Sequence, residues 1–318
     1  MKKLISFIFF CLLSVNAYCQ TNLNLPENLF LKGDVRTKTK SEWGANNTHS
    51  FKAEANLGCD YNLPDAWVSV KMKASTSNGK ESVILLDKAF LGYQLYDGDK
   101  GAVALEVGRN KMDSMYTSKL QYDSYFNGLH VVYNYSQPGM FNFMLHGGPH
   151  VVNSDRNHYG WLAEAEWSHI ADFPLTITYS FTDWNAPKMP KGSDSYRDKN
   201  YLYCISQMTA SYQIYNTTLY GAYLLNHQED HYNDGFYLGF TTGKIQDKGD
   251  FEVDVNFQSC KANAVSPVDF KGLKKGVQVK ATYALAQALN IEGKFTIFDD
   301  HNGSNNNRRL EFAAIYAW

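Results

Sequence analysis

Hydrophobic and polar residues alternate in short segments along most of this chain. Residues 175–182 read Leu-Thr-Ile-Thr-Tyr-Ser-Phe-Thr, and residues 251–258 read Phe-Glu-Val-Asp-Val-Asn-Phe-Gln. Successive side chains of a β-strand point to opposite faces, so each segment predicts a strand with one apolar and one polar face. Burying the acidic face of residues 251–258 in a dry core would cost too much free energy, so we expect the polar faces to meet water.

The same alternation recurs about sixteen times, within about two either way, which predicts an all-β protein. Aromatic residues on both faces blur the alternation in residues 201–212, 217–225 and 236–242. We expect strands at residues 29–38, 51–57, 66–73, 88–95, 103–108, 128–135, 141–146, 161–167, 175–182, 201–212, 217–225, 236–242, 251–258, 277–283, 289–297 and 310–318.

The predicted connections alternate between short and long. Longer polar segments, such as residues 183–200, lie between short turns, and both ends of the predicted sheet lie on the short-turn side. This asymmetry is typical of bacterial outer-membrane barrels, and no linker divides the chain. The short turns contain Asn, Asp, Pro, Gly or small residues and are expected at residues 62–65, 97–100, 136–139, 171–174, 213–216, 246–249 and 286–288.

The two ends of the chain favour export and insertion in a membrane. Lys2 and Lys3 precede an apolar run over residues 4–15, which predicts a signal peptide of residues 1–19, cleaved to leave residues 20–318 as one domain. The last strand runs up to the terminal Trp318, as in an outer-membrane barrel. We therefore expect export through the periplasm to a bacterial outer membrane.

Composition sharpens this interpretation. Aromatic residues make up 15% of the chain, yet the mean hydropathy is −0.40, which fits a barrel with an apolar outside and a wet inside. After residue 20 no apolar run approaches the ~18 residues of a spanning helix. We predict a transmembrane antiparallel up-and-down β-barrel of about sixteen strands, surrounded by outer-membrane lipid. The net charge of −2 predicts no nucleic-acid partner.

The polar faces give candidate pore-lining residues. They are basic in the first strands and acidic in the middle ones. Outward aromatic residues near the turns fit a belt at the membrane interface, whereas Trp67 falls on the inward parity. Opposite charges across a water-filled lumen would set a weak ion preference. The predicted inward charges are Lys32, Arg36, Lys52, Lys71, Lys73, Lys88, Glu106, Glu164, Glu166, Glu252 and Asp254.

A sequence resemblance covers about 25 residues. Val107-Gly108-Arg109, followed by a polar segment and then Asp-Ser-Tyr-Phe-Asn-Gly-Leu over residues 123–129, resembles the phosphate-selective-porin-like family of Gram-negative outer membranes, of the Bacteroidota type. The resemblance implies passive diffusion of small hydrophilic solutes or ions, and a homotrimer. It also implies that the third exterior loop, residues 111–124, enters the lumen; the alternative is a solvated outer loop.

The resemblance adds a second group of candidate residues. Arg109, Lys111, Asp113, Lys119 and Asp123 would place opposed charges at a constriction. Phosphate-selective relatives use ladders of basic residues, but arginine is rare in this chain, which favours weak selectivity over strict anion specificity.

Two other functions stay open at this point. In the first, the barrel serves only as an anchor for ligand-binding or adhesive loops around residues 188–199 and 259–275. In the second, the chain is a soluble periplasmic β-protein. We predict no enzyme, no cofactor and no metal site, because His227 and His231 lie in a predicted loop without a helix to fix them as ligands. Cys59, Cys204 and Cys260 are too widely spaced for a disulfide framework, although a bridge between Cys204 and Cys260 stays open.

Overall fold

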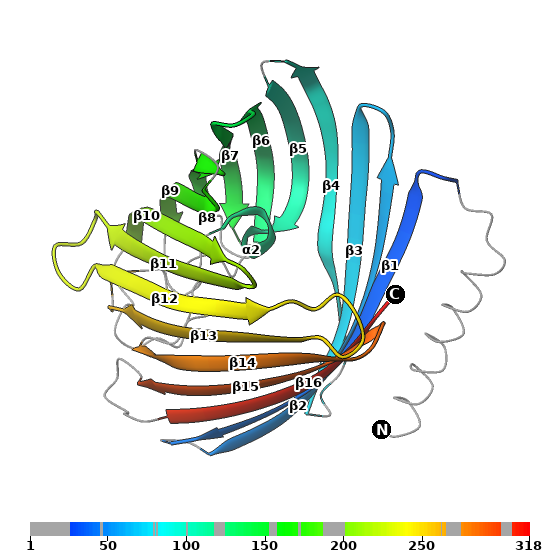
Figure 1. Cartoon of the computed structure of the whole chain (residues 1–318), viewed down its shortest axis with the longest axis vertical. Helices are drawn as coiled ribbons and strands as arrows, with labels where there is room; N and C mark the ends of the chain where they lie inside the picture. The colour runs from blue at the N-terminus through cyan, green and yellow to red at the C-terminus, as the bar shows by residue number, and fades with distance from the viewer. Residues whose placement is uncertain are drawn as a thin grey trace.

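A computed structural model shows a closed barrel in which every strand pairs antiparallel with its neighbours in sequence and β1 pairs with β16. Figure 1 shows the strands wound around one axis. The structure describes residues 26–44, 47–78, 80, 82–99, 101–117, 125–152, 158–170, 173–186, 201–261, 263–264, 275–299 and 307–318. The predicted signal peptide lies outside these residues.

The prediction of an antiparallel barrel of about sixteen strands is confirmed, and each alternating segment of the sequence corresponds to one strand. The only helix among the described residues is the short α2 (Met112–Met115), which follows β5, and no described helix is long and apolar enough to cross a membrane. The strands are β1 (Leu29–Trp43), β2 (Thr48–Asn62), β3 (Ala66–Ser77), β4 (Val83–Gly98), β5 (Gly101–Lys111), β6 (Tyr125–Gln137), β7 (Phe141–Val152), β8 (His158–Ser168), β9 (Leu175–Ala186), β10 (Tyr201–Ile214), β11 (Thr217–Asn226), β12 (Asp234–Gly243), β13 (Phe251–Cys260), β14 (Lys275–Ala286), β15 (Leu289–Asp299) and β16 (Asn307–Ala317).

The first and last strands close the barrel. β1 and β16 pair from Asp34 with Ala317 to Trp43 with Arg308. Beyond this ladder, Trp318 and Gly33 exchange two backbone hydrogen bonds of 3.0 and 3.1 Å. The indole of Trp318 lies over Gly33, where a Cβ atom would come within 2.3 Å of the ring. The pairing of β1 with β16 therefore leaves no unpaired sheet edge along this ladder, as a barrel in lipid requires.

The outer face is apolar and exposed. Large side chains of one alternation set, such as Leu57, Leu91, Leu238 and Phe312, are more than half exposed. The other set faces the barrel axis and carries the charged and hydrogen-bonding residues. We assign the inner face from α2, which lies within the ring of strands in Figure 1 and contacts this polar set through the residues that follow it.

The alternation breaks where the register shifts. β4 contains two such shifts, one opposite Lys71 and Met72 and one between Gln94 and Tyr96. An extra residue in one strand changes which side chains face inward. The run Val-Ile-Leu-Leu over residues 83–86 lies directly beyond the first shift, which explains why the sequence shows no clear alternation there.

Candidate functional site: the inner wall of the barrel

The inner faces of β14, β15, β16 and β1 to β4 form a wall that we call the ionic arc. Its carboxylates are shared between cations: Glu54 lies 2.6 Å from the ammonium groups of both Lys52 and Lys73. In the same way, Glu42 lies 2.8 Å from the Lys40 ammonium and 3.1 Å from the Arg309 guanidinium. Because each of these carboxylates pairs with two cations, the pairs carry an excess of positive charge.

The same sharing recurs at Glu311, and water reaches the cations of the ionic arc. Glu311 is paired with Lys38 and lies 3.1 Å from Lys294. Lysine side chains of this arc range from 19% exposed at Lys73 to 57% exposed at Lys32, which is paired with Asp60. Because these side chains point into the barrel, their exposure indicates a hydrated space along this wall.

The inner faces of β5 to β13 form a second wall, the packed arc, where many polar side chains are buried, among them His130, His146, Glu164 and Gln207. A chain of hydrogen bonds begins next to it on β3, where Trp67 Nε1 donates to Glu106 Oε1 over 3.3 Å. It continues from Glu106 Oε2 to His130 Nδ1 (2.9 Å), from His130 Nε2 to His146 Nδ1 (3.1 Å), and from His146 Nε2 to Glu164 Oε1 (3.2 Å). One continuous network therefore crosses β5 to β8.

The third exterior loop ends this network. After α2, the backbone N–H and the hydroxyl of Thr117 donate to Glu164 Oε1 over 3.0 and 2.9 Å. The ring of Tyr116 stacks on His146, with centroids 4.9 Å apart, and meets His130 edge-on. Residues 112–117 of the loop therefore lie inside the barrel against the packed arc.

An apolar cluster covers the loop end of the packed arc. Leu162 on β8, Ile205 on β10 and Leu224 on β11 belong to the polar alternation set, yet each is at most 3% exposed. They form one cluster with Phe126, Met112 and Tyr116. The alternation of the sequence did not predict this cluster. An apolar residue on the inner face has no explanation from alternation alone, because its contacts come from a distant loop.

The structure brings most of the predicted lining residues to the two inner walls. Lys32, Arg36, Lys52, Lys71, Lys73 and Lys88 lie on the ionic arc, whereas Glu106, Glu164, Glu166, Glu252 and Asp254 lie on the packed arc. Sequence reasoning missed Asp87, which is 3% exposed and receives a 2.6 Å hydrogen bond from the Tyr125 hydroxyl. The register shift in β4 hides this position from a simple alternation.

Two of the predicted constriction residues lie at the loop end of β5, next to the start of β6. Arg109 and Lys111 share the alternation of the outward Val107. Arg109 Nη1 donates to Asn127 Oδ1 over 2.9 Å, and the guanidinium lies 3.9 Å from the ring centroid of Tyr125. The two halves of the motif that carried the resemblance therefore meet at the loop end of β5 and β6. Asp113 is exposed on α2, and Lys119 and Asp123 lie outside the described residues.

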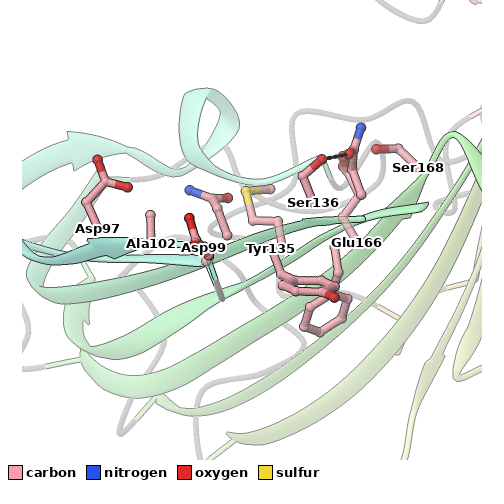
Figure 2. A pocket seen from close by; sticks show the side chains of 13 residues that line it. Asp97, Asp99, Ala102, Tyr135, Ser136, Glu166 and Ser168 are labelled. Atoms are coloured by element: carbon pink, nitrogen blue, oxygen red, sulfur yellow. Dashed lines mark hydrogen bonds between the residues drawn. The ribbon is translucent and has the colours of Figure 1, made fainter. Parts of the chain in front are cut away.

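An acidic hollow of about 460 Å³ lies at the short-turn end of the barrel. It is lined by the end of β4, the turn that follows it, and strands β5 to β8 (Figure 2), and the Ser136 hydroxyl donates to Asn142 Oδ1 over 2.6 Å. Its labelled residues are Asp97, Asp99, Ala102, Tyr135, Ser136, Glu166 and Ser168. Within the described part of the chain, no group of His, Cys, Asp and Glu side chains has metal-site geometry, and Cys59, Cys204 and Cys260 are free thiols.

The barrel is similar to solved structures of outer-membrane porins. It matches Pseudomonas putida OprB with a TM-score of 0.67 at 10% identity, over 92% of this chain and 94% of that one. Salmonella typhi OmpF, solved with daunomycin, gives 0.60 at 13% identity, over 91% and 97%. A loop-deletion mutant of OmpT, an outer membrane protein of Vibrio cholerae, gives 0.56 at 14% identity, over 91% and 99%.

These likenesses establish that the chain has the fold of the sixteen-stranded porins. No family model and no curated protein sequence matches the chain. At identities of 10 to 14%, these matches establish the fold but do not assign the chain to a particular family of porins.

Proposed function

We propose that this protein is an outer-membrane channel through which small hydrophilic solutes and ions diffuse passively. One observation carries the proposal: inside a closed barrel with an apolar outer face, ion-paired lysines remain as much as 57% exposed. Closure satisfies the backbone hydrogen bonds in lipid, and the hydrated ionic arc supplies a path that a solute can follow.

The charges of the two walls support weak selectivity. On the ionic arc Glu54, Glu42 and Glu311 are each shared by at least two cations, whereas Glu164 on the packed arc is fully buried. A solute in the hydrated space would therefore meet more positive than negative charge. We propose that Lys32, Arg36, Lys52, Lys71, Lys73 and Lys88 line the passage, and that it is bounded on the other side by the packed arc, whose carboxylates include Glu106, Glu164, Glu166, Glu252 and Asp254. Residues 112–117 narrow it from the packed arc.

Recordings in planar lipid bilayers test the proposal. Protein purified from outer membranes should produce discrete conductance steps, and the reversal potential in a salt gradient should show a small preference for anions. Membrane fractions and heat-modifiable gel migration would check beforehand that the barrel is folded and inserted. A folded, inserted barrel without conductance steps would overturn the channel and leave the barrel as an anchor.

Two further parts of the proposal concern processing and assembly. Removal of residues 1–19 would give a mature chain beginning at Gln20, which the mass of the purified protein checks directly. The resemblance to porins favours a homotrimer. Cross-linking in native membranes should then give dimers and trimers, and a product that stays at monomer size would contradict this assembly.

A further inference from the structure

The network on the packed arc has a fixed requirement for protons. Its three central contacts join Glu106 to His130, His130 to His146, and His146 to Glu164. A carboxylate oxygen only accepts, and a neutral imidazole has one donor and one acceptor nitrogen. Three contacts need three protons, but two neutral imidazoles supply only two. With both carboxylates ionised, the complete network therefore contains one imidazolium.

The two carboxylate oxygens of Glu164 have different surroundings, so the network can accept a fourth proton and stay complete. Its Oε1 accepts from His146 and twice from Thr117, whereas its Oε2 is buried and accepts no hydrogen bond from any described residue. A proton added to Oε2 leaves all three bonds of Oε1 in place. Loss of the third proton instead brings two acceptor atoms into contact within the network, and no rearrangement of the remaining two protons satisfies all three contacts.

We propose that the Glu106–His130–His146–Glu164 network is a proton-dependent latch that positions residues 112–117 of the third exterior loop within the lumen. Glu164 and His146 act as positioning residues: Glu164 bonds Thr117, and the His146 ring stacks on Tyr116. The latch holds at acidic pH and weakens as pH rises and the third proton is lost. This inference deepens the proposed channel function and rests on it, because the loop narrows the same passage.

Charged and aromatic side chains surround the two histidines. Glu106 faces His130 from β5, Glu164 and Glu166 approach His146 from β8, and Tyr116 packs against both rings from the loop. Lys88 on β4 adds a positive charge, which interacts with that of Glu106. Three carboxylates and one lysine therefore surround the two imidazoles.

The other inward histidine of β7 provides a matched control. His150 is 4% exposed, stacks on Phe126, and contacts only the Gly148 carbonyl among the hydrogen-bond partners that the described residues offer. It shares the strand, burial and aromatic packing of His146 but not the network. A pH response that belongs to the latch should therefore survive His150→Gln.

Two measurements across a pH series test the latch. The series runs from about pH 5 to about pH 10, which brackets the ~6.5 of an unperturbed imidazole. The first is single-channel conductance, which should rise with pH as residues 112–117 are released from the wall and leave the lumen. The second is limited chymotrypsin digestion of the folded full-length barrel, with cleavage after Tyr116 identified by mass. Protection of that bond should be lost at the same pH at which conductance rises.

Variants separate positioning from simple structural support. Glu164→Gln keeps an oxygen that accepts from Thr117 and His146 but removes the negative charge, so the pH midpoint should fall by about one unit, a tenfold weaker hold on the shared proton. His146→Phe keeps a ring beneath Tyr116 and removes both nitrogen atoms, so the pH response should disappear. An unchanged midpoint in Glu164→Gln, or a retained response in His146→Phe, would overturn the latch.

The two readouts also separate this inference from the channel function. Conductance steps together with digestion that is flat across the whole series would reject the latch and leave the channel intact. A chain without conductance steps that still shows pH-dependent cleavage, shifted by Glu164→Gln, would reject the channel and keep the latch.

Discussion

The ionic arc and the packed arc show how one strand pattern supports two kinds of inner wall. On the ionic arc, lysines and shared carboxylates remain in contact with water, and Lys52 is 42% exposed. On the packed arc, Gln207 on β10 is 2% exposed and Leu224 on β11 is completely buried. Both walls come from the same inward alternation, so the sequence pattern alone does not distinguish a hydrated wall from a buried one.

The difference follows from what each wall contacts. Water can solvate a lysine of the ionic arc in many rotamers, so ion pairs there add little stability and mainly set the local charge. A polar side chain of the packed arc has lost that water and depends on a fixed partner, as His146 depends on Glu164 and His130. Substitutions of the same chemistry should therefore have very different costs on the two walls.

The largest effect is expected from a pair of matched substitutions that insert a charge. Gln207→Glu buries a carboxylate on the packed arc and loses the 3.0 Å bond that Gln207 Nε2 donates to Thr209, so it should lower the free energy of unfolding by roughly 3 kcal/mol. Gln278→Glu places the same charge on the ionic arc, two residues from Lys280, and should stay within about 0.5 kcal/mol of wild type. Urea unfolding followed by gel migration measures both, and equal losses would remove the distinction between the arcs.

A smaller effect is expected at the boundary between the arcs, where Trp67 lies over Gly92. A Cβ atom at Gly92 would come within 2.0 Å of the indole, so Gly92→Ala must displace Trp67 from Glu106 and should cost about 2 kcal/mol. Gly293→Ala on β15 is the control, because its Cβ would meet Phe312 at an ordinary 3.6 Å. The same unfolding assay compares them, and a Gly92→Ala variant as stable as Gly293→Ala would show that the indole is not held there.

A third prediction concerns ion preference rather than stability. Changing Lys71 and Lys73 together to glutamate reverses charge in the hydrated space and should lower the anion-to-cation permeability ratio about twofold at ~0.1 M salt, where the Debye length is ~10 Å. Asp254→Asn is the control on the packed arc, where Thr241 and Asn256 already donate to the carboxylate over 2.8 and 2.7 Å. Reversal potentials that move equally in both variants would contradict an ionic arc that lines the passage.

Much of this architecture could be predicted from the sequence, for a physical reason. Each strand lies between lipid and the polar interior, so the period of two survives along most strands and marks their number and their turns. The run through Leu175, Ile177 and Tyr179 is an example, because its hydroxyl-bearing partners face inward on β9. The inward charges could be assigned by the same parity.

The remaining features depend on contacts between distant segments. The apolar Ile205 and Leu224 interrupt the polar inner face, where they belong to one buried cluster with Met112 and Tyr116 of the third loop. The inward Trp67 requires a glycine opposite it in the register, 25 residues away at Gly92. Arg109 was placed at a constriction by resemblance alone, whereas its own alternation groups it with Val107.

The smallest change in stability is expected on substitution of a carboxylate outside both arcs. It serves as a reference for the buried carboxylate that Gln207→Glu introduces. In the turn between β12 and β13, the backbone N–H groups of Gln246 and Asp247 donate to Asp250 over 2.9 and 2.7 Å and lower the pKa of its carboxyl. A lowered folded pKa means that the stabilisation is present above the unfolded pKa and is lost as pH falls through the folded one. Asp250→Asn should therefore be slightly less stable than wild type at neutral pH and equally stable in acid. The control is Asp247→Asn, which keeps the backbone N–H donor and should be as stable as wild type at every pH. If Asp250→Asn stays less stable than wild type in acid, the carboxylate charge is not what stabilises the turn.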